Sequence, residues 1–521
     1  MKNLELLRCS LALSALSLIP LSGLAQNQIR PNIIFIMADD MRPEIKSYGI
    51  DRAVTPNLDR LVAKGVLFTR AYCQQAVCAA SRASMFIGMR PDAAGVDYPY
   101  SQYYVNSLLA EYPTLFCTFS KNGYHLETLG KLHHGYVESV QGNHREFRTN
   151  EYYDPVNQKI YNNPIIESRR AKIAELLPYE LADLSDSLYD DNQMGDAAVE
   201  FIKNYNNSGN DKPYFLGVGF WKPHAPYVAP AKYAEPFKLE DIELSVSKDH
   251  MPDVELALPH VSTLPRYKME DGVPGRKGNQ GYDCSDQRAK EIIRAYLACT
   301  NFIDAQIGKI IDVLSQTDQL YNTIIIFASD HGYHLGDHTH WGKTTNFECS
   351  AKTPLIVVDP RVRQKGVKCN ALVELVDIYP SLIDMAGFDV PDFIEGISFR
   401  QLISNPEKDW KTAAFSQFPR GGKVEGYSIR TDSFRYTEWR EKNGTELGEL
   451  IAAELYDHVN DSLEMYNLAE TIEFKPVREQ LQTKLNLGWK RALPKEIKNN
   501  SNNPVAPFPD AWGPEAIKRL E

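Results

Sequence analysis

Several apolar segments of this chain run directly into charged or histidine side chains. Residues 31–38 lead into Asp39 and Asp40, and residues 323–328 lead towards Asp330. Continuous apolar runs of this length, separated by helical segments, are typical of buried parallel strands. They predict an α/β fold with a largely parallel central sheet. Ligands of such sheets bind beyond the carboxyl ends of the strands, so the residues after the runs are predicted to share one site. These residues are Asp39, Asp40, Lys131, His224 and Asp330.

The chain has 521 residues, which is too many for one ordinary core and predicts a large domain with a smaller one. Residues 1–25 are expected to be a signal peptide, because a basic start precedes an apolar run and the small residues of a cleavage site. The large domain is expected over residues 26–410. Short strand-like runs followed by one helix predict a small α+β subdomain over residues 411–521.

The leader predicts an exported protein, periplasmic in a bacterium and secreted or lysosomal in a eukaryote. Its apolar run is too short for a confident membrane span, so we expect none in the mature chain. The net charge of −11 argues against nucleic acid as a partner. An anionic ligand would therefore need a local basic pocket, since the global field repels it.

Cys78 stands four residues before Arg82 in the stretch Cys-Ala-Ala-Ser-Arg. This stretch is typical of a helix start, where the helix dipole lowers a thiol pKa or steadies an anion. Arg82 would lie one turn along on the same face. A buried apolar cysteine is the alternative interpretation. Seven of the eight cysteines follow the leader, and this odd number indicates an unpaired thiol, which we assign to Cys78.

Two acidic positions suggest a metal ion. Asp39 and Asp40 follow one apolar run, and Asp330 with His331 follows another. Adjacent carboxylates suit a hard divalent cation, which prefers oxygen ligands. Acidic residues after strands are also ordinary turn formers, so one pair alone would not predict a metal site. Two such sites after two apolar strands favour one.

Cationic side chains occupy the loops after the other runs. Lys131 is followed three residues later by His134, and His133 is an alternative for the same role. His224 lies between two prolines, which fix its loop at low entropic cost. A solvated lysine and a turn histidine are the ordinary alternatives. Another histidine cluster precedes Lys343, but its spacing does not by itself define a zinc site, and we interpret its members as loop residues: His334, His338 and His340.

The stretch from Cys78 to Arg82 resembles the core motif of the type I, formylglycine-dependent sulfatases, Cys-x-Pro/Ala-x-Arg. Ala80 stands where Pro is the more common residue. Further segments that resemble the family recur in its order, over about residues 29–400: residues 32–40, Gly130-Lys131, Lys222-Pro223-His224 and Ser329-Asp330-His331-Gly332. Within the family the chain looks most like iduronate-2-sulfatases and bacterial glycosaminoglycan (heparin) 2-O-sulfatases, through Gly-Lys-x-x-His, Lys-Pro-His and the segment 330–343.

The resemblance implies an alkaline-phosphatase-like fold and a role for each matched residue. A sulfatase-maturing enzyme would convert Cys78 to formylglycine, whose hydrated form attacks sulfur. A Ca²⁺ ion would be held together with residue 78 by Asp39, Asp40, Asp330 and His331, although many members carry Asn at the last position. Three cations would neutralise the sulfate: Arg82, Lys131 and Lys343. Two histidines would contact the diol and the leaving oxygen: His134 and His224.

The resemblance implies a sulfuric ester hydrolase that acts on a sulfated oligosaccharide. The expected substrate is the 2-O-sulfate of a uronic acid in heparin, heparan sulfate, chondroitin or dermatan fragments. A phosphonate or phosphate ester hydrolase of the same superfamily is an alternative, since phosphate diesters carry the same charge as sulfate monoesters. A binding protein for sulfated glycans with an unmodified Cys78 is another, and the intact mass of the mature protein separates it from an enzyme.

Overall fold

The structure is a computed structural model that describes residues 30–96, 112–133, 143–145, 177–246, 256–258, 284–421, 423–443, 446–499 and 501. Contacts group residues 31–521 into one compact unit. Three segments lie outside the described residues: the expected signal peptide, most of the Pro- and Gly-rich stretch 245–285, and the end of the chain from residue 502. None of the helices in the described ranges is long and apolar enough to cross a membrane.

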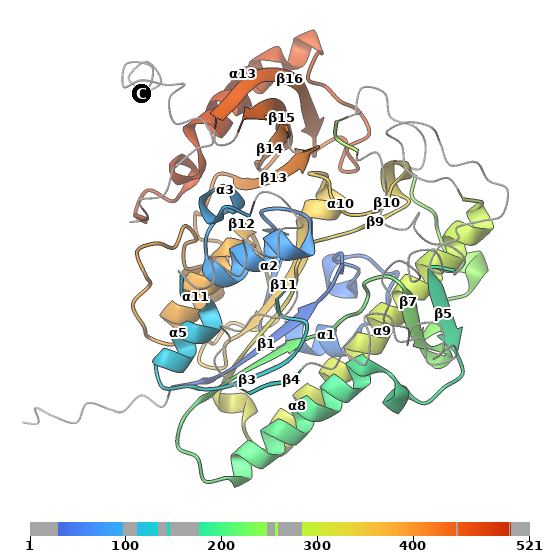
Figure 1. Cartoon of the computed structure of the whole chain (residues 1–521), viewed down its shortest axis with the longest axis vertical. Helices are drawn as coiled ribbons and strands as arrows, with labels where there is room; N and C mark the ends of the chain where they lie inside the picture. The colour runs from blue at the N-terminus through green and yellow to red at the C-terminus, as the bar shows by residue number, and fades with distance from the viewer. Residues whose placement is uncertain are drawn as a thin grey trace, which may run out of the picture. The chain divides into compact units, whose positions relative to one another are not determined.

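Within the described residues, eight strands form the central sheet in the order β12-β2-β11-β8-β1-β6-β3-β4 (Figure 1). Their bounds are β1 (Asn32–Ala38), β2 (Val66–Tyr72), β3 (His125–Gly130), β4 (Asn143–Arg145), β6 (Tyr214–Gly219), β8 (Thr323–Ser329), β11 (Lys352–Val358) and β12 (Val367–Glu374). Strand β11 is antiparallel to both its neighbours, whereas the other neighbouring strands of this sheet pair in parallel. The predicted largely parallel sheet is confirmed, with β11 as its reversed strand.

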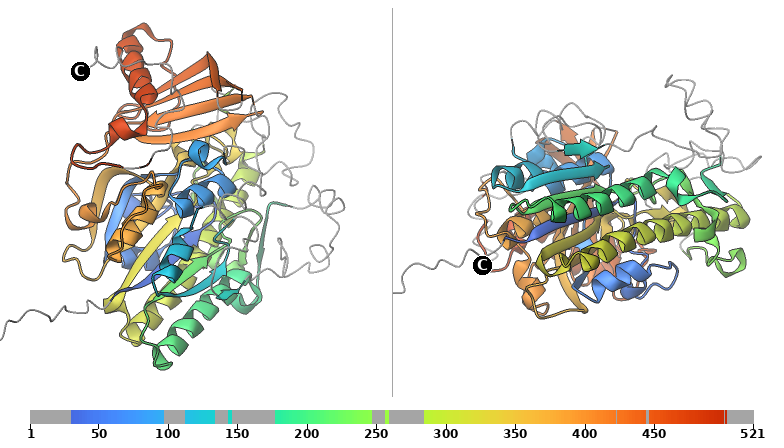
Figure 2. Two further views of the ribbon diagram at one scale, coloured as in Figure 1. Left: turned by 60° about the vertical axis from the view of Figure 1, so that its left-hand side comes forward. Right: turned by 90° about the horizontal axis from the view of Figure 1, so that it is seen from below.

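Alternation along β1 shows how the sheet is covered on both faces. Ile33 and Phe35 pack into an apolar cluster with three helices on one face: α2 (Cys78–Ile87), α5 (Leu115–Lys121) and α11 (Ile378–Met385). Ile34 and Ile36 pack on the opposite face with three others: α1 (Pro56–Val62), α8 (Asp190–Asn207) and α9 (Asp286–Gln316). Figure 2 shows the resulting helix–sheet–helix layers. A strand buried on both faces can be apolar throughout, which explains the continuous runs in the sequence.

The C-terminal region forms a second sheet of four antiparallel strands among the described residues, covered by one helix (Figure 1). These elements are β13 (Ala414–Arg420), β14 (Val424–Arg430), β15 (Phe434–Asn443), β16 (Glu446–Asp457) and α13 (Lys475–Leu487). The amide of Gln417 donates to the carbonyl of Gln74, which ties β13 to the segment before α2. The predicted domain boundary at residues 410 and 411 stays a prediction.

Candidate active site

The two acidic segments meet because their strands are neighbours. Strands β1 and β8 pair in parallel, with Ala38 opposite Ser329, so the residues after them emerge at the same edge of the sheet. The amide of Asp40 donates to Asp330 Oδ1 at 3.1 Å. The amide of Met41 donates to Ser329 Oγ at 2.9 Å. These bonds hold the two strand ends together and bring residues separated by 290 positions into contact.

Asp40 is held in an unusual backbone conformation. Its φ of 65° lies in the left-handed region, which costs a residue other than glycine about 1–3 kcal/mol. The Tyr296 hydroxyl on α9 donates to the Asp40 carbonyl at 2.8 Å and helps to hold this conformation. The side chain is fully buried, and its Oδ2 accepts no hydrogen bond from any residue that the structure describes. A buried carboxylate oxygen without a hydrogen bond is suited to bind a donor or a cation.

Cys78 is the first residue of α2 and is only 3% exposed. Its surroundings are polar rather than apolar, in contrast to the alternative of a core cysteine. The Sγ atom lies 3.4 Å from Asp39 Oδ1, 3.5 Å from His331 Nε2 and 2.8 Å from the Lys343 ammonium. A side chain at this position therefore faces acids, a histidine and a lysine at once.

Arg82, one turn after Cys78, bridges the two strand ends. Its Nε donates to Asp330 Oδ2 at 2.9 Å, and its Nη2 lies 3.2 Å from Asp39 Oδ1. Its Nη1 donates to the carbonyl of Leu132 at 3.1 Å. Burial opposes the charged form, but the two carboxylates hold the pKa of Arg82 above its usual value. The guanidinium is thus a fixed positive charge in the floor of the site.

Two lysines from distant loops add positive charges next to the carboxylates of the site. Lys131, directly after β3, donates to Asp39 Oδ2 and lies 5.3 Å from the centre of the Trp221 ring. Lys343 donates to Asp40 Oδ1 as well as to Cys78. Burial opposes its charge, but Asp40 raises the pKa of Lys343 well above its usual value. We call the resulting group the strand-end cluster: Asp39, Asp40, Arg82, Lys131, Asp330 and Lys343.

His224 lies at the edge of this cluster, in the loop after β6. Its Nε2 is 3.8 Å from Asp40 Oδ2, and its side chain is 23% exposed, so it faces both the cluster and solvent. Its Nδ1 donates to the carbonyl of Ala225 at 2.6 Å. Lys222 donates to the carbonyls of His224 and Pro226 at 3.1 and 2.6 Å. Lys222 therefore braces the loop and does not enter the cluster.

His331 is completely buried beside Cys78. Its Nδ1 donates to the Gly332 carbonyl at 2.8 Å, which turns Nε2 towards Asp40 Oδ1 at 3.4 Å and Asp330 Oδ2 at 3.6 Å. Burial opposes its protonation, but the carboxylate of Asp330 raises the pKa of His331 to about 9. Burial in turn raises the pKa of Asp330 to about 6, against the charges of His331 and Arg82.

The donor atoms fit a divalent cation. Ligand atoms of Asp39, Cys78, Asp330 and His331 all lie within 4.8 Å of one another. The carboxylate oxygens are donors that Ca²⁺ prefers, whereas an imidazole nitrogen is a less usual partner for this ion. The unsatisfied Oδ2 of Asp40 borders the same space. These residues could hold a metal ion, with three carboxylates supplying the negative charge.

The sequence offered two histidines after Lys131 for contact with the diol or the leaving oxygen. The first, His134, lies outside the described residues. Its alternative, His133, packs against Phe86 and Phe116 with ring centres 5.1 and 5.5 Å away, in the apolar layer beneath α2. Sequence reasoning also missed Tyr296 and Trp221, which contact Asp40 and Lys131. No motif contains them, because an aromatic residue on a helix or after a strand is ordinarily a core residue.

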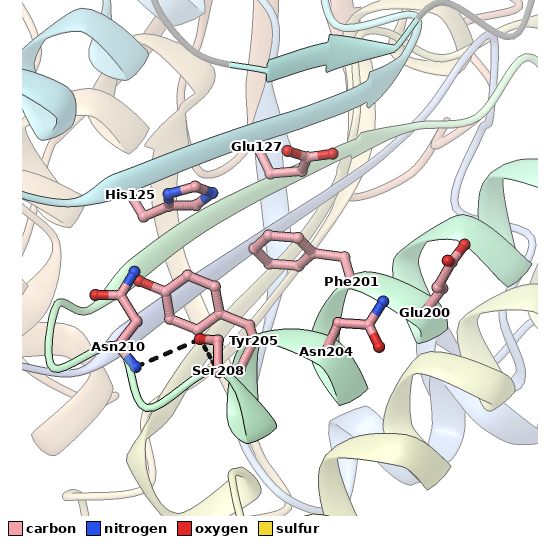
Figure 3. A pocket seen from close by; sticks show the side chains of 8 residues that line it. All are labelled: His125, Glu127, Glu200, Phe201, Asn204, Tyr205, Ser208 and Asn210. Carbon is pink, nitrogen blue, oxygen red and sulfur yellow. Dashed lines mark hydrogen bonds between the residues drawn. The ribbon is translucent and has the colours of Figure 1, made fainter.

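A hollow of about 390 Å³ opens at the other end of β3 and has a different character (Figure 3). Figure 3 shows His125 of β3 facing Phe201 and Tyr205 of α8 across this hollow. Glu127 and Glu200 line it as well, so its charge opposes an anionic substrate. The strand-end cluster, at the carboxyl edge of the sheet, is the better candidate for the site.

Comparison with known proteins identifies the group to which this fold and cluster belong. The sequence profile described as Sulfatase matches residues 31–388, which span most of the chain. The chain belongs to the sulfatase family. Residues 336–490 also match the profile described as the C-terminal part of N-sulphoglucosamine sulphohydrolase. This sulfatase is therefore a sulfuric ester hydrolase.

One relative and two solved structures show how far the likeness extends. The chain is 30% identical to iduronate 2-sulfatase of Mus musculus, over 84% of this chain and 90% of that protein. A solved 2-O GAG sulfatase superposes with a TM-score of 0.63 and 20% identity, over 94% and 99% of the two chains. The phosphonate monoester hydrolase of Agrobacterium radiobacter superposes with a TM-score of 0.67 and 23% identity, over 88% and 95%. The last two likenesses show the fold alone.

Proposed function

We propose that this sulfatase removes the 2-O-sulfate of a uronic acid from glycosaminoglycan oligosaccharides. The strand-end cluster carries the chemistry of the proposal, because it gathers three buried cations and three carboxylates around residue 78. The likeness to iduronate 2-sulfatase over most of both chains supports the substrate class. The acidic chain does not attract an anionic glycan as a whole, so the local cations must bind the sulfate.

Two groups absent from the structure belong to the proposal. Residue 78, converted to formylglycine and hydrated, would supply the nucleophile for sulfur. Ca²⁺, when bound by Asp39, Asp40, Asp330 and His331, would supply positive charge next to the nucleophile and the sulfate. Both fit the observed surroundings, because Cys78 Sγ already lies beside these ligands and Asp40 retains an unsatisfied oxygen.

Three side chains of the chain would provide the remaining positive charges and the proton donor. Arg82, fixed by Asp39 and Asp330, would hold positive charge under residue 78 as negative charge develops. Lys343 has a pKa well above its usual value, which makes it a steady charge and a poor proton donor. His224 reaches both the cluster and solvent, and its Nε2 is the atom that we assign to protonate the departing sugar oxygen.

Defined disaccharides test the substrate. Released sulfate is measured for disaccharides sulfated at the 2-O, 6-O, 4-O or N position, together with a phosphate monoester. We expect the 2-O-sulfated uronate to be hydrolysed with the highest kcat/KM. A preference for a 6-O- or N-sulfate would contradict the proposed 2-O position but would leave the assignment as a sulfatase intact. A preference for the phosphate ester would contradict the proposed class of substrate.

The modification is tested by mass. The mature protein, purified from cells that contain a sulfatase-maturing enzyme, should be about 18 Da lighter than its sequence predicts, since formylglycine replaces cysteine. Peptide mapping should place the difference at Cys78, and the other cysteines serve as internal controls. An unshifted mass in an active preparation would remove formylglycine from the account.

A further inference from the structure

A second group of metal-ligating side chains lies in the segment that carries Lys343. The donor atoms of His334, His338 and Cys349 all lie within 4.8 Å of one another. The residues come from β9 (His334–Leu335), the 3₁₀ turn η7 (Asp337–Thr339) and α10 (Glu348–Ala351). Both histidines are buried, and Cys349 is partly exposed. None of the three belongs to the strand-end cluster.

The distances suit a tetrahedral ion with nitrogen and sulfur ligands. Cys349 Sγ lies 3.4 Å from His334 Nδ1 and 3.5 Å from His334 Nε2. Zinc binds sulfur at about 2.3 Å and imidazole nitrogen at about 2.0–2.1 Å, so tetrahedral geometry separates the two donors by about 3.5 Å. The 3.5 Å between Cys349 Sγ and His334 Nε2 matches this separation, and the similar distance to Nδ1 means that the imidazole must turn slightly for Nε2 to face a shared ion.

Each histidine is also oriented as metal-bound histidines usually are. His334 Nδ1 donates to the Asp337 carbonyl at 3.1 Å, and His338 Nε2 donates to the Leu463 carbonyl at 2.8 Å. Backbone carbonyls on one ring nitrogen fix the ring and direct the other nitrogen to the metal. His334 Nε2 and His338 Nδ1 would then be the ligands. The Thr345 hydroxyl, 2.8 Å from His334 Nε2, would have to turn away or join the ion.

The carboxylates next to these side chains are already paired with cations, Asp337 with Arg42 and Glu464 with Arg435. The ion would therefore be held by the two imidazoles and the Cys349 thiolate, and its binding would release the thiol proton to solvent. We propose that His334, His338 and Cys349 form a second metal site, for a soft divalent ion such as Zn²⁺.

The site would connect the active-site loop to the C-terminal sheet. His338 contacts Leu463, which follows β16, and His340 Nε2 donates to the carbonyl of Lys343 at 2.9 Å. An ion that fixes His334 and His338 would therefore fix the segment that carries Lys343. This role does not depend on the substrate proposed above.

Cobalt provides a direct test, because a thiolate bound to Co²⁺ gives a charge-transfer band in the near ultraviolet. The full mature chain carrying Cys78→Ala, which removes the active-site thiol, is stripped of metal and titrated with Co²⁺. We expect about one equivalent to produce the band and Zn²⁺ to abolish it. Cys349→Ser should lose the band, whereas Cys284→Ser, at another partly exposed cysteine, should keep it.

Two further measurements keep the test decisive. His338→Asn should weaken Co²⁺ binding at least tenfold even if Cys349→Ser folds poorly. Metal analysis of the protein as purified should find about one zinc per chain. A chain without zinc and without the band, or a band of equal strength in Cys349→Ser, would overturn the proposal.

Discussion

Two clusters of buried charge in this sulfatase differ in whether their carboxylates are satisfied. In the Glu374 cluster (Arg90, Glu374, Asp377 and Lys411), Arg90 pairs with both oxygens of Glu374 at 2.8 Å. Lys411 lies 2.7 Å from Glu374 and from both oxygens of Asp377. In the strand-end cluster, Asp40 Oδ2 accepts no hydrogen bond from the described residues. Asp40 also has a positive φ.

The difference teaches that buried charge alone does not indicate a site. The Glu374 cluster joins β12 to the C-terminal sheet, since Glu374 also accepts from the amide of Phe415 at 2.9 Å. All four carboxylate oxygens of Glu374 and Asp377 have a donor within the cluster, so they leave no oxygen for a further cation. The strand-end cluster combines a carboxylate oxygen without a hydrogen bond and a residue with positive φ at the carboxyl edge of the sheet. Features of this kind gather at functional sites.

Removal of residue 78 should give the largest effect. Cys78→Ala leaves no nucleophile, so we expect sulfate release to fall to the background rate while thermal unfolding stays close to that of the unaltered chain. Cys117→Ala, at a buried cysteine in α5, is the matched control and should retain activity. Persistent turnover in Cys78→Ala would show that the strand-end cluster works without this side chain.

Lys411→Met tests the cluster that we regard as structural. It leaves the buried Asp377 without its cation, whereas Glu374 keeps Arg90. Breaking a buried pair in this way costs about 3–5 kcal/mol of the free energy of unfolding. Urea denaturation measures the loss. The kcat of the molecules that remain folded should be unchanged. A large fall in kcat with normal stability would show that the Glu374 cluster also takes part in the reaction.

Lys343→Met makes the same substitution in the strand-end cluster. We expect kcat to fall about 10²–10³-fold, because a fixed charge next to the reacting sulfate is lost. With Ca²⁺ present, the loss of stability should be smaller than for Lys411→Met, since the ion still balances the carboxylates. If only KM rises, Lys343 binds substrate without stabilising the transition state.

The smallest effect on stability is expected at Glu454, a buried acid that forms no ion pair in the described residues. Glu454 accepts from Trp439 Nε1 and from the Tyr456 hydroxyl, and burial raises its pKa to about 7. The folded state therefore binds the Glu454 proton more tightly than the unfolded state does. Ionisation of Glu454 therefore lowers the free energy of unfolding. This loss is absent below about pH 4.5 and grows as the pH rises to about 7, to at most about 3 kcal/mol.

Glu454→Gln should remove this pH dependence. The difference in urea midpoint between the variant and the unaltered chain should then grow in favour of the variant from pH 5 to pH 8. Parallel curves for the two proteins would mean that Glu454 is ionised at neutral pH without cost. Glu374 is a carboxylate of that kind, because burial opposes its ionisation but Arg90 and Lys411 outweigh burial and lower its pKa to about 2.

The sequence predicted the parts of the site that follow apolar strands. Asp39 and Asp330 could be grouped because parallel strands end at one edge, and this rule needs no knowledge of side-chain contacts. Tyr296 could not be found in this way, since its contact with Asp40 depends on how α9 lies across the sheet. Helix α8 was also missed, because its polar residues weaken the helical pattern.

The histidines before Lys343 show the same limit. Their spacing alone did not predict a metal site, and they were interpreted as loop residues. Cys349, which completes the group, is 11 residues beyond His338 on a separate turn. The Glu374 cluster was likewise invisible in the sequence, because Arg90 and Glu374 are 284 positions apart. Contacts over such distances depend on the packed fold, whereas strand ends can be recognised locally.

Calcium binding tests the central claim most directly, because the claim is that the carboxylates of the strand-end cluster bind a cation and those of the Glu374 cluster do not. Thermal unfolding of the metal-free chain is measured with and without Ca²⁺. At a hundredfold excess over Kd, the ion should add about 2.7 kcal/mol of stability. Asp40→Asn should lose most of this gain, and Asp377→Asn should keep it. An unchanged midpoint on addition of Ca²⁺ to the unaltered chain would contradict the account.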